Sequence, residues 1–100
     1  MDEKIAKEMI GKVVLVGVTA RNHGDEILGQ EQYFGTVLRV SEEEGLIILR
    51  GDTGEEMWLP PALDHYEHAA PGEYRLRSTG QVVTNPDYLA TFNRYPPQVQ

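Results

Sequence analysis

The sequence predicts a mainly β protein, a small and strongly bent antiparallel β-barrel of six or seven short strands with a short N-terminal helix. Apolar or alternating segments of strand length recur along the chain, and clusters of Gly, Pro, Asn, Asp and Ser separate them at the spacing of tight turns. The first segment has helical spacing instead. With 100 residues, the chain is expected to form one domain over 1–100. The expected elements are a helix over about 2–10 and strands over about 12–19, 30–41, 45–50, 55–59, 73–77, 81–84 and 88–93.

The first two elements follow from a change of period at Gly11. Residues 2–10 begin with acids and place Ile5 and Met9 one helical turn apart, which predicts a short helix. Because so short a helix is unstable alone, it must pack its apolar side on the rest of the protein or fray. Residues 12–19 are β-branched and apolar on both faces, which predicts a central strand.

A long strand and two hairpins come next. Residues 30–41 alternate, and a bend is expected at Gly35, because a glycine inside a strand commonly marks one. Alternation assigns one face to Tyr33, Gly35, Val37 and Arg39 and the other to Phe34, Thr36, Leu38 and Val40. An acidic turn over 42–44 leads to the strand at 45–50, and Gly51 to Gly54 leads to the strand at 55–59.

The C-terminal part predicts a third hairpin and a last strand. Residues 62–66 suit either one helical turn or an ordered loop. The strands at 73–77 and 81–84 alternate across a turn, and Asn85-Pro86-Asp87 turns the chain again. Residues 88–93 favour a strand, with a helix over 86–94 as the alternative.

Charge and composition narrow the classes of partner. Sixteen acidic against nine basic residues give a net charge of −7, which suits a basic protein partner better than nucleic acid. The absence of cysteine excludes disulfides and thiolate metal sites. No apolar run reaches the roughly 20 residues that span a bilayer, and the acidic start is unlike a signal peptide. We therefore expect a cytoplasmic protein with no membrane partner.

Catalytic and metal-binding patterns are weak, so we expect neither an enzyme nor a cofactor. Ser41 and Ser78 lie in turn-like sequence without the flanks of a catalytic nucleophile. The tripeptide Asp52-Thr53-Gly54 matches that of aspartic proteases, but two glutamates follow it directly, and a hairpin turn is favoured. The best candidate metal ligands are His23, Asp64, His65 and His68. We interpret these as polar loop residues and predict no metal site.

The order of elements over residues 2–60 resembles that of Sm-like and related small-barrel proteins. The resemblance depends on Gly11-Lys12 at the entry to an apolar strand, on Phe34-Gly35 in a long bent strand, and on the strand at 45–50. It implies open strand edges that pair into rings, and a role beside RNA. In that role Lys12, Arg75 and Arg77 would lie at the pore of the ring.

The aromatic residues Trp58, Tyr66 and Tyr74 are the candidate protein-binding residues. They surround Pro60-Pro61, and aromatics beside prolines can line a groove for an extended peptide. For Trp58 alone, the favoured interpretation is that it fills the barrel. We expect a non-enzymatic module that binds itself, in a homo-oligomer, or a partner protein, including the case of an acidic antidote-type protein that masks a basic partner. An Sm-like RNA-associated ring protein is the alternative.

Overall fold

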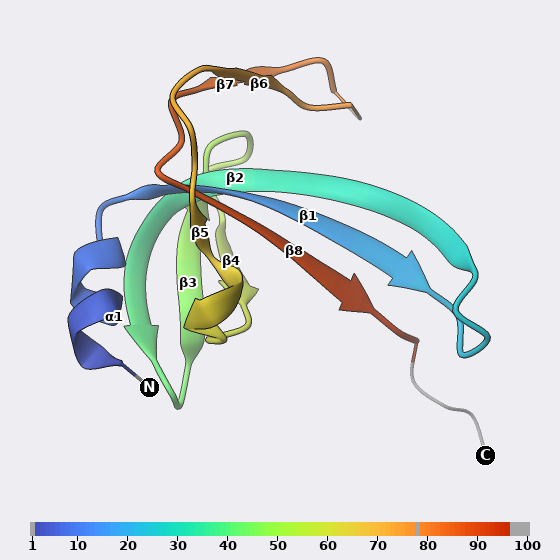
Figure 1. Cartoon of the computed structure of the whole chain (residues 1–100), viewed down its shortest axis with the longest axis horizontal. Helices are drawn as coiled ribbons and strands as arrows, with labels where there is room; N and C mark the ends of the chain where they lie inside the picture. The colour runs from blue at the N-terminus through green and yellow to red at the C-terminus, as the bar shows by residue number, and fades with distance from the viewer. Residues whose placement is uncertain (1, 78, 97–100) are drawn as a thin grey trace.

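Eight strands and one short helix make up the described part of the chain, residues 2–77 and 79–96 of a computed structural model (Figure 1). The elements are α1 (Glu3–Met9), β1 (Val13–Arg21), β2 (Ile27–Ser41), β3 (Gly45–Arg50), β4 (Glu56–Leu59), the 3₁₀ turn η1 (Leu63–His65), β5 (Glu67–His68), β6 (Glu73–Arg75), β7 (Val82–Thr84) and β8 (Tyr88–Arg94). The mainly β prediction is confirmed, and the alternative helix over 86–94 does not form. The turn at 62–66 is present as η1, while β5 was not predicted.

The strands form a six-stranded sheet, ordered β4-β3-β2-β1-β8-β5, and a separate β6–β7 hairpin. All neighbouring strands are antiparallel except β1 and β8, which are parallel. The prediction of a purely antiparallel sheet is therefore wrong. Asp87 explains the parallel pair, since its carboxylate and its backbone N–H bond the N–H and C=O of Val13 at 2.9 and 2.8 Å. Both strands thus start at the same end of the sheet.

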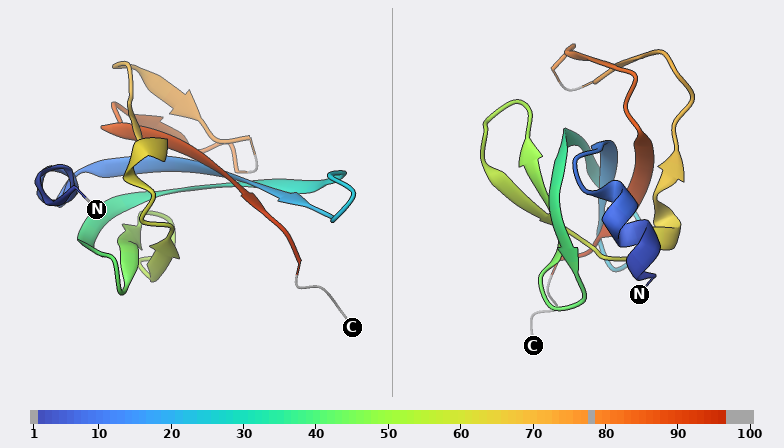
Figure 2. Two further views of the ribbon diagram at one scale, coloured as in Figure 1. Left: turned by 60° about the horizontal axis from the view of Figure 1, so that its bottom comes forward. Right: turned by 90° about the vertical axis from the view of Figure 1, so that its left-hand side faces the viewer.

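The large sheet is strongly bent, but the described residues do not close it into a barrel. Its two ends are β4 and β5. Figure 2 shows β3 and β4 turned to one side of the β1–β2 ribbon and the β6–β7 hairpin on the other. The register of β2 against β3 shifts between Val37 and Arg39, which leaves Leu38 as a bulge. Val37 and Val40 consequently both pack on the inner core, although simple alternation assigns them to opposite faces.

The concave face of the bent sheet holds the main core. Val14, Val16, Leu46 and Ile48 are fully or almost fully buried there. The helix α1 covers one end of this core with Met9, and the carboxylate of its N-cap residue, Asp2, accepts hydrogen bonds from the first turn. The helix is therefore packed on the sheet and not frayed.

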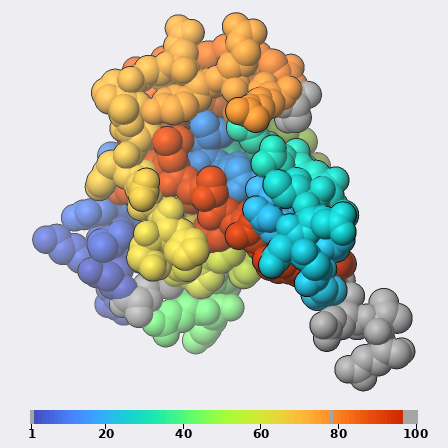
Figure 3. Space-filling view, turned by 45° about the vertical axis from the view of Figure 1, so that its right-hand side comes forward, coloured from blue at the N-terminus to red at the C-terminus, as the bar shows by residue number. Residues whose placement is uncertain are grey.

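A second, smaller core lies on the convex face. The β6–β7 hairpin covers Leu15 there with Leu76 and Val83. Figure 3 shows this hairpin, in orange, spread across one end of the molecule. Because the hairpin covers only part of the convex face, Leu49 of β3 and Trp58 of β4 stay exposed on it, whereas Ile47 is buried.

Candidate functional site

An apolar hollow of about 270 Å³ opens where the inner core ends. The register pairs Val18 of β1 with Phe92 of β8, and the hollow lies between these two strands and the edge of β4. Its walls are formed chiefly by Val18, Tyr33, Met57, Trp58 and Phe92, with Arg94 at one side. This volume lies below the roughly 300–1,000 Å³ of ordinary small-molecule pockets. It fits a few side chains of a polypeptide.

Two larger hollows are more polar. One of about 630 Å³ lies between α1 and the acidic turn at 42–44, where Glu3, Lys7 and Glu43 line it. Another of about 440 Å³ lies on the convex face beneath Arg77, against Thr19 and Gln32. Since neither has aromatic walls, the hollow beside β4 is the better candidate for binding a protein.

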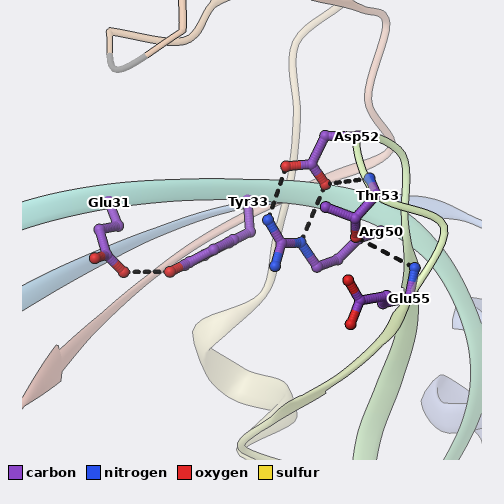
Figure 4. A network of polar contacts seen from close by, with 6 residues as sticks. All are labelled: Glu31, Tyr33, Arg50, Asp52, Thr53 and Glu55. Carbon is purple, nitrogen blue, oxygen red and sulfur yellow. Dashed lines mark hydrogen bonds and ion pairs between the residues drawn. The ribbon is translucent and has the colours of Figure 1, made fainter.

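Polar contacts hold Tyr33 in place in the wall of this hollow (Figure 4). The Tyr33 hydroxyl donates a hydrogen bond to Glu31, which raises the pKa of Tyr33. The Arg50 guanidinium lies 4.9 Å from the centre of the same ring and bonds Asp52 through two nitrogens, at 3.1 and 2.8 Å. This ion pair lowers the pKa of Asp52. The ring is thus held in place before any ligand arrives.

Trp58 lies on the outer side of β4 and is 57% exposed. The interpretation that it fills a barrel is therefore wrong. Its indole covers Gly45, where a Cβ atom would overlap the indole nitrogen and lie 2.9 Å from the carbonyl oxygen of Leu59. Gly45 has a φ of +84°, which also favours glycine. The absence of a side chain at Gly45, at the start of β3, thus lets the indole of Trp58 pack directly on the strand.

The strand β4 presents an open edge beside the hollow. Among the described residues, its one strand neighbour is β3. The N–H of Arg50 bonds the carbonyl of Glu55 at 2.8 Å, and the same register continues along β4. In an antiparallel ladder, hydrogen-bonded and non-hydrogen-bonded pairs alternate. The backbone N–H and C=O groups of Glu56 and Trp58 therefore point away from β3.

Acidic side chains gather at the start of this edge. Arg39 bonds both Glu44, at 3.0 Å, and Glu56, at 2.8 Å, whereas Glu55 is exposed and lies beside Arg50. Two carboxylates thus share one guanidinium on the outer face. The edge is negatively charged at one end and apolar at the other, where Trp58 lies.

The three predicted aromatic residues do not form one surface. Tyr66 is buried in the main core; its hydroxyl donates to the carbonyl of Pro60 at 2.8 Å, and its ring lies 5.6 Å from that of Phe92. Burial raises the pKa of Tyr66. Tyr74 belongs to the β6–β7 hairpin and packs on the smaller core. Tyr66 supports the hollow from behind, and Trp58 alone of the three is exposed at this strand, with its indole on the outer face of β4.

The basic residues expected at an RNA-binding pore lie outside this hollow. Lys12 is exposed just before β1, and Arg75 is exposed on β6. Arg77 follows β6, and its backbone N–H donates to the side chain of Gln32 at 2.6 Å. These residues line no part of the β4 hollow.

The candidate metal ligands are dispersed over three places. His23 contacts the carbonyl of Pro96 at 2.8 Å, His65 follows Asp64 in η1 and stacks on Phe92, and the ring of His68 is tilted against that of Tyr88. Within residues 2–77 and 79–96, no three histidines or carboxylates are placed to hold a metal ion.

The candidate catalytic residues lie in turns. Asp52-Thr53-Gly54 forms the turn between β3 and β4, as predicted. The Ser41 hydroxyl accepts a hydrogen bond from the backbone of Glu44 at 2.9 Å, and Ser78 lies outside the described residues.

Sequence reasoning missed Tyr33, Phe92 and Arg94 as residues of the hollow. They come from strands far apart in the chain, and the parallel register of β8 on β1 is needed to bring them together. Comparison with family models, curated proteins and solved structures finds no match to this chain. In the part of the chain that the structure describes, no helix is long and apolar enough to cross a bilayer.

Proposed function

We propose that this chain is a non-enzymatic module that binds a partner protein at the hollow beside β4. The observation that carries the proposal is the coincidence of an apolar hollow, an exposed tryptophan and an open strand edge. Tryptophan is enriched among the residues that dominate the affinity of protein interfaces. The small volume of the hollow supports a polypeptide over a small molecule.

A partner of different sequence is favoured over a second copy of this chain. Each copy carries a net charge of −7, so like charge opposes self-association. The carboxylates of Glu44 and Glu56, which share the single guanidinium of Arg39, add to that repulsion at the binding edge. A basic partner would meet complementary charge there, as an antidote-type role requires. The Sm-like resemblance and its RNA-binding role stay predictions without support from this hollow.

Selection from a display library of random linear peptides tests the proposal. We expect peptides to be enriched on the wild-type protein and to bind Trp58→Ala at least tenfold more weakly, because truncating an interface hot spot costs about 2 kcal/mol or more. The matched control is Leu28→Ala, since Leu28 is also an exposed apolar residue but lies at the start of β2.

Two outcomes would overturn the proposal. One is a selection that enriches no peptide, and the other is a set of peptides that bind the Trp58→Ala variant and the wild type equally. Circular dichroism of both variants confirms that they fold. In parallel, light scattering measures the mass of the protein in solution. We expect the 11.3 kDa monomer. A closed oligomer would mean that the chain binds further copies of itself and not a partner protein.

A further inference from the structure

We infer that the partner contributes a short basic segment that adds to β4 as an antiparallel strand and extends the sheet. The inference depends on the proposed function, because it specifies how a protein would bind at the same hollow. It follows from the backbone, the two faces and the charge of β4.

The backbone of β4 supplies the first argument. The outward N–H and C=O groups of Glu56 and Trp58 can form a ladder with an added strand. Antiparallel pairing is slightly the more stable per residue and is the pairing that β4 already makes with β3. In that arrangement, the residues opposite Glu56 and Trp58 direct their own N–H groups toward β4.

The two faces of β4 fix the pattern of side chains in the added strand. On the inner face, Met57 is next to Phe92 at the hollow, so inward side chains of the segment must be apolar. On the outer face, the neighbours of the segment are Trp58 and Glu56. Outward positions therefore favour basic side chains. Such side chains can pair with the carboxylate of Glu56, and their aliphatic carbons or charged group can pack on the indole of Trp58.

Charge and length complete the description of the segment. On the outer face, the carboxylates of Glu44 and Glu56 outnumber the one arginine, Arg39, that bonds both of them. The strand β4 has four residues and is followed by Pro60, which has no N–H group. An added segment of about four to six residues therefore suffices, alternating between basic and apolar side chains.

Synthetic peptides test the inference, with Trp58 as the reporter because it is the only tryptophan in the chain. The probe is the capped hexapeptide Lys-Val-Arg-Val-Lys-Val, and the charge control replaces its three basic residues with glutamate. We expect the basic peptide to change Trp58 emission saturably and to bind at least tenfold more tightly than the acidic one. The difference should shrink as salt is raised.

Methylation of alternate peptide nitrogens then tests strand addition itself. Antiparallel addition predicts that N-methyl groups on the three basic residues weaken binding roughly tenfold or more, because their N–H groups face β4. N-methyl groups on the three valines face solvent and should change affinity less than about threefold.

Each other result overturns a different statement. If the valine nitrogens are the sensitive ones, the orientation is parallel and the inference is wrong as stated. If neither set matters, the peptide binds without adding a strand, while the proposed function stands. If the hexapeptide does not bind but library peptides bind in a Trp58-dependent way, the basic alternating segment is wrong. If no peptide binds, the proposed function itself fails.

Discussion

Replacement of Gly45 by alanine tests whether the indole of Trp58 packs directly on this glycine. The substitution has two costs, because Gly45 has a φ of +84° and because its new methyl group would overlap the indole and approach the carbonyl of Leu59. Gly54 is a matched control, since its φ is +73° and nothing lies within 4 Å of a Cβ placed there. The comparison therefore separates backbone strain from the steric contact with the tryptophan.

The magnitudes follow from these two costs. A left-handed backbone costs a residue with a Cβ about 1–2 kcal/mol, which is the expected loss for Gly54→Ala. Overpacking adds about 1–3 kcal/mol, so Gly45→Ala should lose about 2–5 kcal/mol. In a Trp58→Ala background, the indole is gone and the loss should shrink by about 1 kcal/mol.

Urea unfolding followed by far-ultraviolet circular dichroism measures all four proteins without depending on tryptophan emission. Equal losses for Gly45→Ala and Gly54→Ala would refute the reasoning. So would an excess loss at Gly45 that is unchanged when Trp58 is alanine, because the indole would then not lie over the glycine.

Three further predictions concern the core and ionisable groups. Ile48 is fully buried, so Ile48→Ala should lower the free energy of unfolding by about 2–5 kcal/mol. Ile10 is 48% exposed, so Ile10→Ala should change it by about 0.5 kcal/mol or less. Urea unfolding measures both values. Burial raises the pKa of Tyr66, so the unfolded state ionises first and stability should fall as pH rises above the ordinary value of 10.0; the fall should be less steep in Tyr66→Phe, and an unchanged slope would contradict the burial. Arg50 lowers the pKa of Asp52, so this pairing stabilises the fold above the ordinary pKa of 3.8 and is lost as pH falls below it; an NMR titration should place the midpoint of Asp52 below 3.8 and move it up in Arg50→Gln.

Local sequence patterns predict most of the fold. The helix needs only the i,i+4 spacing around Met9, and the strand over 45–50 is bounded on both sides by turn residues. Such signals lie within a few residues of one another, so they can be read without knowing the tertiary structure. The three predicted hairpins form for this reason.

Long-range pairing is what the sequence did not reveal. The parallel pairing of β8 with β1 depends on Asp87 bonding Val13 across most of the chain. The bulge at Leu38 depends on the partner strand β3. Neither leaves a periodic signal in the segment itself, so the predicted sheet was antiparallel throughout and the predicted faces of β2 were regular.

The residue types of the candidate site can be predicted from the sequence, but their positions cannot, because these also depend on long-range pairing. The residue type of Trp58 and the prolines after it predict a binding residue, but its exposure depends on which face of β4 meets the core. The sequence predicts Tyr66 on a binding surface, because aromatics near prolines can line grooves, yet in the structure it is buried behind Phe92. Tyr33 joins the hollow through the β1–β2 register, which its local sequence does not encode.

Hydrogen exchange of the β4 amides tests the open edge most directly. In the free protein, we predict rapid exchange at Glu56 and Trp58, whose N–H groups point away from β3, and slow exchange at Met57 and Leu59. Addition of the basic hexapeptide should slow exchange at Glu56 and Trp58. Slow exchange at these two amides in the free protein would contradict the account, because it would mean that the edge is already paired, in a closed barrel or with a second copy.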